Sequence, residues 1–486
     1  MTSSKSARAF YQVTRSGEIR RSGGPVGDRR YHVAAPPITR YVLGGDSFRS
    51  TGRYASRFMD IHWVYLALLA TCLLSCVQGV LGVIAGWRFL REVKAAVARG
   101  RRQLDSAGRF TFQPPLAVIL PCCGVDEYLH RTVEQLARQN YNDYEVIFTF
   151  ESQSDPAYAA VVEWTRGWGA PPYRLVVAGS ADARSQKVHN LLAALKQVSA
   201  DRKVLIFLDS DAVPGDDWLG HMVAPLSDES VGAATGFRWY CAKGGIANGV
   251  RSVWNAASLT LFEQERTRFC WGGATAILRE RFDSLRVAER WDRALSDDLQ
   301  VTMAIKEAEL RIVFVPQALI PSHDQTTLRG FWEFAVRQLT ITRIGAPRLW
   351  WSGFFLCQSF MLGGTVAAVL CVGAALGLFG SPAILAISAG LWGIISLTTV
   401  GRAALRQSAV KKVLGPPDLT WRDTAWDIGG ALLIGIVHQL LFMASMRGRV
   451  INWRGRTYEM VSGEETRILR SPGATGGVTH PPAKAV

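Results

Sequence analysis

The sequence predicts an α/β domain placed between transmembrane helices. Strand and helix patterns alternate from residue 115 to residue 325, with strands expected at 116–121, 144–150 and 203–208 and helices at 129–139 and 187–198. Such alternation is typical of a parallel sheet with helices on its faces. Apolar segments long enough to cross a bilayer stand before and after this region, at 63–86, 350–379, 382–400 and 426–446.

A hydrophobic content of 48% together with a net charge of +15 indicates apolar segments flanked by basic ones. We therefore expect a membrane protein and no nucleic-acid partner, because the arginines do not cluster with aromatic residues in any recognisable nucleic-acid-binding module. The eight cysteines include no Cys-x-x-Cys pair, so neither a zinc site nor a disulfide framework is indicated. The sequence leaves the oligomeric state open.

Residues 1–62 are polar and basic without a periodic apolar face, which predicts a disordered tail. The expected transmembrane helix 63–86 contains no charge and has Trp63 and Trp87 at its ends as interfacial anchors. The basic juxtamembrane linker 87–114 then predicts that the following α/β domain, residues 115–325, is cytoplasmic. The basic tail would then lie on the outer side of the membrane, whereas basic residues are expected on the cytoplasmic side.

After the α/β domain we expect an interfacial helix at 326–349, a membrane region of two or three segments at 350–446, and a tail at 447–486 that is disordered toward its end. The segment 426–446 has charged residues around its start, at Arg422, Asp423 and Asp427. We therefore interpret it as interfacial or re-entrant, with a full span as the alternative.

Asp209 and Asp211 follow directly after the apolar strand 203–208. Side chains two positions apart in an extended segment point the same way, so both carboxylates are expected at the carboxyl edge of the sheet, where ligands bind. Their mutual repulsion is relieved by a hard divalent cation that carries substrate phosphates. This pattern predicts that Mg²⁺ or Mn²⁺ is held by Asp209 and Asp211; a solvated turn is the alternative. The sequence has no glycine-rich phosphate loop.

A series of short motifs gives the chain a family resemblance. They are Gly124-Val-Asp126, Tyr141-x-x-Tyr-Glu145, Asp155-Pro-Ala157, Lys187-x-x-Asn190, Asp209-Ser-Asp211, Gly272-Gly-Ala-Thr275, Ser296-Asp-Asp298 and Trp453-Arg-Gly-Arg-x-Tyr458. In order and spacing they resemble ceramide glucosyltransferases and the bacterial relatives that glycosylate hopanoids, within the class that includes cellulose and hyaluronan synthases. The likeness covers roughly residues 60–460.

The resemblance implies a GT-A (Rossmann-like) nucleotide-sugar domain inserted between transmembrane helices. It implies inverting, metal-dependent transfer of a hexose, with glucose expected, from a UDP-sugar to the hydroxyl of a ceramide-like lipid. A hopanoid or diacylglycerol acceptor, a processive polysaccharide synthase and a non-catalytic membrane scaffold are the alternatives. The small-residue, arginine-rich composition suggests a bacterial inner membrane.

The resemblance also implies roles for the acidic residues and one lysine. Glu151 and Asp155 would bind the uracil and ribose, and Lys187 the nucleotide or its phosphates. Ser152 stands where ceramide enzymes more often have an aspartate, so the carboxylate that takes the base stays open. A surface acid and a solvated lysine are the structural alternatives. Asp209 matches the ceramide enzymes, whereas Asp211 matches the wider class.

Asp298 matches the general base, the carboxylate that takes the proton of the attacking hydroxyl. Asp297 is expected on the acceptor side without pointing at the same atom. An acidic pair after Ser296 is also ordinary helix capping, and this alternative stays open.

The family pattern Gln/Arg-x-x-Arg-Trp is missing from the expected position before the membrane region. Arg337, Gln338 and Arg343 are expected to supply the missing contacts to the diphosphate, with binding of lipid headgroups by these arginines as the alternative.

Three further residues are expected near the acceptor. Trp453 and Arg454 match a C-terminal family motif, although they could equally anchor the chain at the membrane interface. His323 stands in a region that approaches the metal or the acceptor in some relatives, with an ordinary loop histidine as the alternative.

Overall fold

The computed structural model describes residues 11–13, 19–21, 47–106, 108–378 and 382–471, with side chains from Trp63 onward. The chain forms two compact units, Met1–His62 and Trp63–Val486. The first unit contains a short antiparallel pair, β1 (Tyr11–Val13) and β2 (Ile19–Arg21), and the beginning of α1 (Ser47–Arg102). The predicted disorder of residues 1–62 falls largely outside the described residues.

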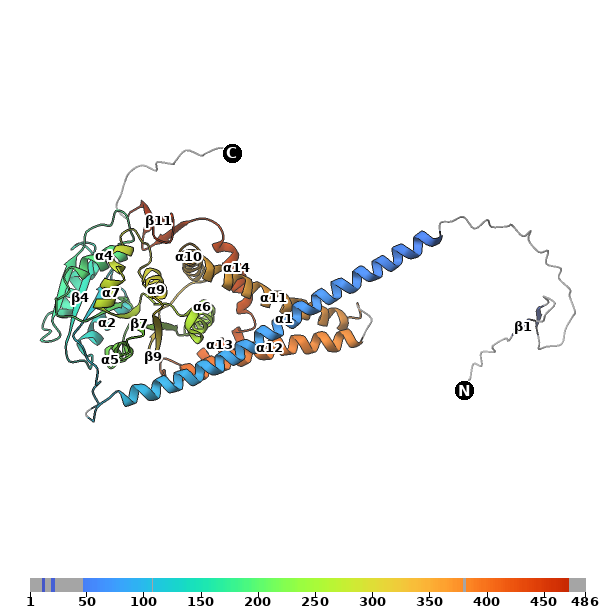
Figure 1. Ribbon diagram of the computed structural model, residues 1–486, viewed down its shortest axis with the longest axis horizontal. Coiled ribbons are helices and arrows are strands. Elements are labelled where there is room, and N and C mark those ends of the chain that lie inside the picture. The colour runs from blue at the N-terminus through green and yellow to red at the C-terminus, as the bar shows by residue number, and fades with distance from the viewer. Residues whose placement is uncertain (1–10, 14–18, 22–46, 107, 379–381, 472–486) are drawn as a thin grey trace, which may run out of the picture. The chain divides into compact units, whose positions relative to one another are not determined.

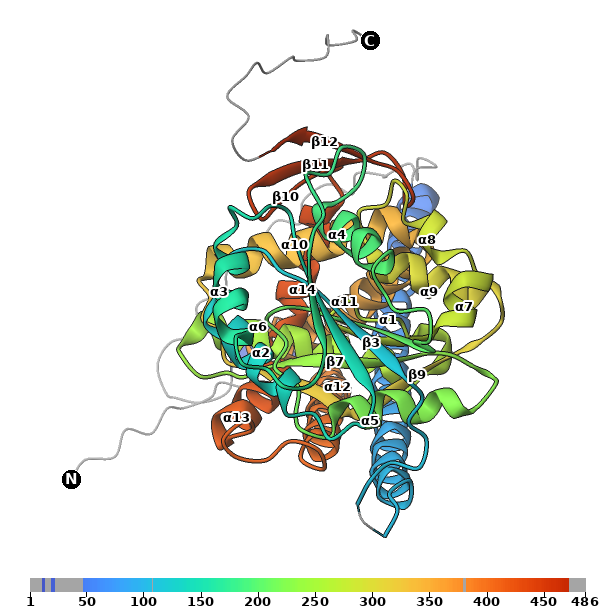
Figure 2. The ribbon, with the colours of Figure 1, turned by 90° about the vertical axis from the view of Figure 1, so that its left-hand side faces the viewer.

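The second unit is built on a seven-stranded sheet with the order β5-β4-β3-β6-β8-β7-β9 (Figures 1 and 2). Its strands are β3 (Leu116–Pro121), β4 (Tyr144–Phe150), β5 (Tyr173–Val177), β6 (Val204–Leu208), β7 (Val231–Tyr240), β8 (Ala274–Leu278) and β9 (Arg311–Ser322). Strands β3 to β6 pair in parallel and β8 runs antiparallel to both of its neighbours. The sheet is therefore mainly parallel, as predicted.

Helices and short 3-10 turns connect these strands. They are α2 (Glu127–Ala137), α3 (Pro156–Thr165), α4 (Gln186–Leu195), α5 (Trp218–Val223), η1 (Ala224–Ser227), α6 (Ile246–Ser258), η2 (Leu259–Glu263), η3 (Glu265–Thr267), α7 (Arg279–Ser284), α8 (Val287–Arg290) and α9 (Asp297–Glu307). Successive strand residues point to opposite faces, so Val118 packs in the core with α2 and α3 whereas Ile119 packs in the core with α4 and α9. Both faces of the sheet are covered, and the carboxyl ends of its parallel strands remain for a site.

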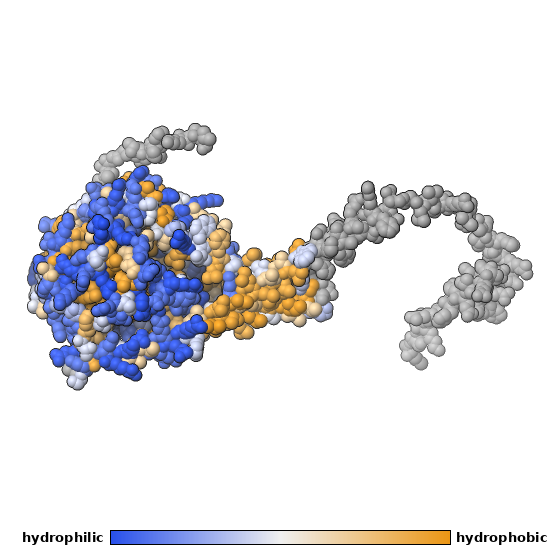
Figure 3. Space-filling view, viewed as in Figure 1, coloured by the Kyte–Doolittle hydropathy of each residue, from blue (hydrophilic) through white to orange (hydrophobic). Residues whose placement is uncertain are grey.

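Within the described part of the chain, three helices are long and apolar enough to cross a membrane: α1 from Trp63 to Arg102, α11 (Pro347–Ala375) and α12 (Pro382–Val410). Buried residues of all three form one apolar cluster, and apolar surface gathers over them beside the hydrophilic α/β domain (Figure 3). The predicted fold class, an α/β domain inserted between such helices, is confirmed.

Some predicted boundaries differ from the structure. The linker 87–114 continues α1 as far as Arg102, because its alanines, lysine and glutamate favour a helix. The region 326–349, where an interfacial helix was expected, contains α10 (Leu328–Gly345). The segment expected at 426–446 is a pair of helices, α13 (Trp421–Gly430) and α14 (Ile434–Ser445), bent by 70° at the break between them.

The tail predicted at 447–486 contains an antiparallel three-stranded sheet: β10 (Val450–Trp453), β11 (Arg456–Met460) and β12 (Thr466–Arg470). Figure 2 shows this sheet above α4 and beside α10. Gln186 N donates a hydrogen bond of 3.3 Å to Tyr458 Oη, and Gln300 Nε2 donates one of 2.7 Å to Gly463 O. The tail is therefore held against the α/β domain up to residue 470, and the expected disorder after residue 471 lies outside the described residues.

Candidate active site

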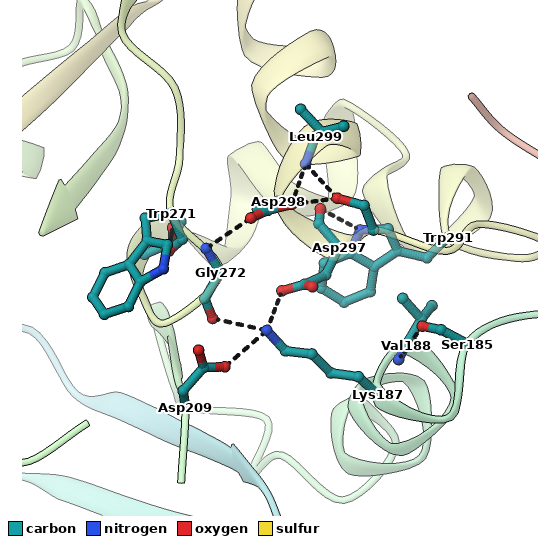
Figure 4. A network of polar contacts seen from close by, with 12 residues as sticks. Ser185, Lys187, Val188, Asp209, Trp271, Gly272, Trp291, Asp297, Asp298 and Leu299 are labelled. Atoms are coloured by element: carbon teal, nitrogen blue, oxygen red, sulfur yellow. Dashed lines mark hydrogen bonds and ion pairs between the residues drawn. The ribbon is translucent and has the colours of Figure 1, made fainter. Parts of the chain in front are cut away.

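The site lies where the carboxyl end of β6 meets the first turns of α4 and α9 (Figure 4). Asp209 follows the last residue of β6. Ser185 caps α4 by accepting a hydrogen bond of 3.2 Å from a backbone N–H of the first turn, and Ser296 caps α9 in the same way. The caps fix these turns, so that Lys187 and Asp297 point toward each other.

Lys187 joins two carboxylates to the loop before β8. Its Nζ lies 2.8 Å from Asp209 Oδ1 and 3.2 Å from Asp297 Oδ2, and it donates a hydrogen bond of 3.2 Å to Gly272 O. A Cβ atom at position 272 would lie 2.7 Å from Asp297 Oδ2 and 2.9 Å from Lys187 Nζ. Glycine is therefore needed at position 272 for the loop to come this close.

The charges of this cluster depend on one another. Burial alone would lower the pKa of Lys187, but the negative charges of Asp209, Asp297 and Asp298 raise it above its ordinary value. Burial raises the pKa of Asp297 to about 7, with Asp298 and Asp209 adding to the effect and Lys187 opposing it. Lys187 is therefore charged at neutral pH, whereas Asp297 is near its titration midpoint.

Asp297→Asn is expected to make protein stability less dependent on pH. The folded protein holds the Asp297 proton up to about pH 7, whereas the ordinary pKa is 3.8, so the free energy of unfolding falls as pH rises through this window. Asparagine has no carboxyl proton to release, and its side-chain oxygen can still accept a hydrogen bond from Lys187. We expect a shallower fall in unfolding temperature from about pH 4 to about pH 7 for the variant, measured in metal-free detergent. Parallel wild-type and variant profiles would contradict this assignment.

Asp298 points to other partners than Asp297. Its Oδ2 accepts a hydrogen bond of 3.2 Å from Gly272 N, and its Oδ1 accepts one of 2.8 Å from Leu299 N and another from Ser296 Oγ. Asp298 is half-buried and lines the cavity described below. Asp298 therefore contributes to the cap of α9, which was the structural alternative, and its side chain also lines the cavity.

Asp211 is paired with Arg238 of β7, a residue that the sequence analysis missed. Arg238 Nη1 lies 2.9 Å from Asp211 Oδ2 and Nη2 lies 2.6 Å from Asp211 Oδ1. Burial would raise the pKa of Asp211, but the guanidinium lowers it to about 2. The available signal was an arginine within the mostly uncharged run Val231–Tyr240, because a charge in a strand that becomes buried needs an acidic partner.

Glu151 and Asp155 follow β4, but they differ in role. Glu151 lines the cavity, accepts a hydrogen bond of 2.6 Å from Ser180 Oγ and forms an ion pair with Arg456 of β11. Burial opposes ionisation of Glu151, yet the bonds from Arg456 and Ser180 lower its pKa. Asp155 instead caps α3 and accepts a hydrogen bond of 2.9 Å from Gly124 N, outside the cavity lining.

The C-terminal motif also reaches the site. Arg454 and Gly455 form the two-residue turn between β10 and β11, with φ of 48° and 76°. A turn of this kind needs positive φ at both positions. Trp453 and Arg454 line the cavity, as do Arg337 and Gln338 of α10. Burial lowers the pKa of Arg337, with the nearby charge of Arg454 adding to the effect.

Arg343 and His323 are not brought to the site. Arg343 Nε donates a hydrogen bond of 2.7 Å to Ser445 O and therefore ties α10 to α14. His323 Nε2 lies 2.9 Å from Asp418 Oδ1. Neither residue lines the cavity, because each side chain is directed to a local partner elsewhere.

One cavity of about 1770 Å³ connects the carboxylates to the helices that are apolar enough to cross a membrane. Its polar end contains Glu151, Asp209 and Asp298, and its lining then continues over α10 to α1, α11, α12 and α14. At the apolar end, Gly82 belongs to α1 and Gly364 to α11. The cavity thus joins a polar end and an apolar end in one volume.

The carboxylates fit a divalent cation only when a further ligand joins them. Among the described residues, no group of three or more His, Cys, Asp or Glu side chains is placed to hold a metal. Asp209 and Asp211 could supply two carboxylates, and Mg²⁺ commonly takes one or two carboxylates and completes its shell with substrate phosphates and water. These residues therefore suit a cation that arrives with a diphosphate.

Comparison with known proteins gives a family match over most of the chain. The model of glycosyl transferase family 21 matches residues 67–466. A mannosyltransferase from Pyrobaculum calidifontis, solved with GDP-Man and Mn²⁺, is similar at 18% identity and a TM-score of 0.41, covering 72% of this chain and 99% of that chain.

Two other solved structures are more distant. Glucosyl-3-phosphoglycerate synthase from Mycobacterium tuberculosis, with Mn²⁺, UDP and phosphoglyceric acid, has 16% identity and a TM-score of 0.29, covering 52% of this chain and 81% of that chain. TarS from S. aureus, with UDP-GlcNAc, has 10% identity and a TM-score of 0.32, covering 73% of this chain and 99% of that chain.

Proposed function

The chain belongs to glycosyl transferase family 21, and on this premise we propose that it transfers a hexose from a UDP-sugar to the hydroxyl group of a membrane lipid. Glucose is the first candidate for the sugar and a ceramide-like lipid for the acceptor, with hopanoids and diacylglycerol as alternatives. The proposal includes a GT-A type domain, inversion at the anomeric carbon and a need for Mg²⁺ or Mn²⁺. It also places the α/β domain in the cytoplasm of a bacterium, on the basis of the basic residues after the first apolar segment.

The observation that carries this proposal is the continuity of the cavity. A soluble acceptor would need only the polar end, whereas the lining extends to Gly364 and other residues of the membrane helices. An acceptor with an apolar body and a hydroxyl at one end matches both parts. Its body would lie between the helices while its hydroxyl reaches Asp298.

Each polar group has a part in the proposed transfer. The acceptor oxygen forms a bond to the anomeric carbon, the bond from that carbon to UDP breaks, and the acceptor proton passes to Asp298. Asp209 and Asp211 would hold the cation, which stabilises the negative charge of the departing UDP. Lys187 keeps Asp209 and Asp297 in place.

The cationic side chains would stabilise the leaving group. Arg337 and Arg454 line the cavity and add positive charge on the side where the family's Arg-Trp pair is missing. Glu151, which follows β4 and is paired with Arg456, would accept hydrogen bonds from the nucleoside.

The first test is an acceptor panel. The purified protein in lipid nanodiscs is given UDP-glucose, Mn²⁺ and, separately, ceramide, diacylglycerol or a hopanoid, and products are read by mass spectrometry. We expect a lipid that carries one hexose. A product with many sugars would favour a polysaccharide synthase, and a folded protein that neither binds UDP nor turns over any UDP-sugar would favour the scaffold.

Gly364→Leu is expected to weaken use of the lipid without affecting the nucleotide. A Cβ at position 364 meets only Ile395 Cγ2 at 3.7 Å, so a larger side chain extends into the apolar part of the cavity. We expect the KM for the lipid to rise on the order of tenfold, with UDP affinity unchanged in calorimetry.

Gly390→Leu is the matched control for this change. Gly390 lies on α12, is exposed, has no neighbour within 4 Å of a built Cβ and does not line the cavity. We expect wild-type KM values for this variant. Equal KM changes in both variants, or none in Gly364→Leu, would contradict an acceptor path between the helices.

A further inference from the structure

Arg238 lies against both carboxylates proposed to hold the cation. Its guanidinium is bidentate to Asp211, and Nη2 stands 3.9 Å from Asp209 Oδ2. The side chain is only 9% exposed, so its charge has little access to water. Nothing in the resemblance or in the predicted motifs gave this residue a role.

Aromatic rings hold Arg238 independently of Asp211. Its guanidinium carbon lies 5.3 Å from the ring centre of Trp271 and 5.7 Å from that of Tyr240. The guanidinium carbon of Arg251 lies 4.1 Å from the centre of the same Tyr240 ring, and Arg251 forms an ion pair with Asp324. These cation–π contacts favour a guanidinium that stays at the edge of the cavity even when its partner changes.

A divalent cation and Arg238 compete for the same oxygens. Both Asp211 oxygens accept hydrogen bonds from Arg238, so coordination through either oxygen weakens or breaks one of these bonds. A released guanidinium would stay buried and would need another anion, because an unpaired buried charge is costly. A diphosphate offers pairs of oxygens that can accept the two parallel N–H bonds of the guanidinium fork.

We propose that Arg238 is a donor-binding residue that couples the metal to the diphosphate. It competes with the metal for Asp211, and it moves its bidentate contact to the diphosphate when the sugar nucleotide binds. The cation alone then binds weakly, whereas cation and diphosphate bind together. This inference rests on the proposed function and gives Arg238 the place of a diphosphate-binding arginine in a chain without the Arg-Trp pair.

The test measures Mn²⁺ binding without catalysis. Full-length protein in detergent is titrated with Mn²⁺, alone and with saturating UDP, and the free ion is followed by electron paramagnetic resonance. In Arg238→Gln we expect Mn²⁺ alone to bind on the order of tenfold more tightly than in the wild type, because Asp211 is freed. We expect the gain in Mn²⁺ affinity caused by UDP to shrink on the order of tenfold.

Arg251→Gln is the matched control, since it removes a buried arginine from the same aromatic ring without touching Asp211. Its Mn²⁺ affinity without UDP should equal that of the wild type. Where Arg238→Gln does not fold, Arg238→Lys keeps the charge but loses the fork, and should shift the affinity in the same direction by a smaller factor.

The outcomes separate this inference from the proposed function. A wild-type protein that binds UDP with Mn²⁺, beside an Arg238→Gln protein with unchanged Mn²⁺ affinity, overturns the role of Arg238 alone. A folded wild-type protein that binds neither Mn²⁺ nor UDP overturns both. If Arg251→Gln also bound Mn²⁺ more tightly, the effect would come from a general loss of positive charge. That result would overturn the proposed competition between Arg238 and the metal for Asp211.

Discussion

Asp298→Asn is expected to lower kcat for sugar transfer about 100-fold to 10,000-fold, the range that a general base contributes. Asparagine has no group that takes the proton from the acceptor hydroxyl at neutral pH. In the wild type, Leu299 N and Gly272 N each donate a hydrogen bond to one oxygen of the Asp298 carboxylate. The asparagine amide still offers an oxygen to one of these two donors. We therefore expect the fold and the affinity for UDP to be retained.

The measurement is the rate of glycolipid formation by mass spectrometry, combined with calorimetry for UDP. Asp292→Asn is a suitable control, because Asp292 is an exposed carboxylate of the same region that is paired with Arg184 at 3.1 Å. Turnover close to that of the wild type in Asp298→Asn would move the role of base to another carboxylate, with Asp297 as the nearest.

Lys187→Met is expected to destabilise the folded protein by about 3–5 kcal/mol at alkaline pH, where the buried carboxyl of Asp297 is ionised and has lost its cation. The lysine side chain is 15% exposed and the Asp297 side chain 6% exposed, so water cannot replace the lost contacts well. Part of the loss should already be recovered at neutral pH, because Lys187 lowers the pKa of Asp297 and its removal lets the carboxyl take up a proton.

Thermal unfolding in detergent gives the measure, with Lys196→Met as the control because Lys196 is an exposed lysine at the end of the same helix. Combining Lys187→Met with Asp297→Asn should restore part of the unfolding temperature, since one unpaired charge is removed. An unfolding temperature of Lys187→Met equal to that of the wild type would mean that the lysine does not hold the cluster together.

Local sequence patterns were sufficient for the part of the site that depends on neighbouring residues. The apolar run before Asp209 marks a buried strand, and Asp209 indeed lies at the carboxyl end of β6. A local signal also existed for Asp155, because an aspartate followed by Pro156 is typical of a helix start. That capping role, and not a place in the cavity, is what the structure gives to Asp155.

The contacts between distant segments had no local signal. Arg238 meets Asp211 across 27 positions, and Arg456 meets Glu151 across 305. Such pairings depend on strand order and on where the C-terminal strands dock, which neither periodicity nor spacing specifies. For the same reason, the resemblance could place Trp453 and Arg454 near the acceptor without showing that a small sheet carries them there.

The docking of β10–β12 on the α/β domain restricts the number of bilayer crossings between them. Both parts share the hydrogen bonds from Gln186 to Tyr458 and from Gln300 to Gly463, so they lie on one side of the membrane. The chain between them must therefore cross an even number of times. If α11 and α12, which are each long enough for one crossing, both cross a bilayer, the bent pair of α13 and α14 adds no net crossing. A third crossing there would separate Arg456 from Glu151 by the thickness of the bilayer.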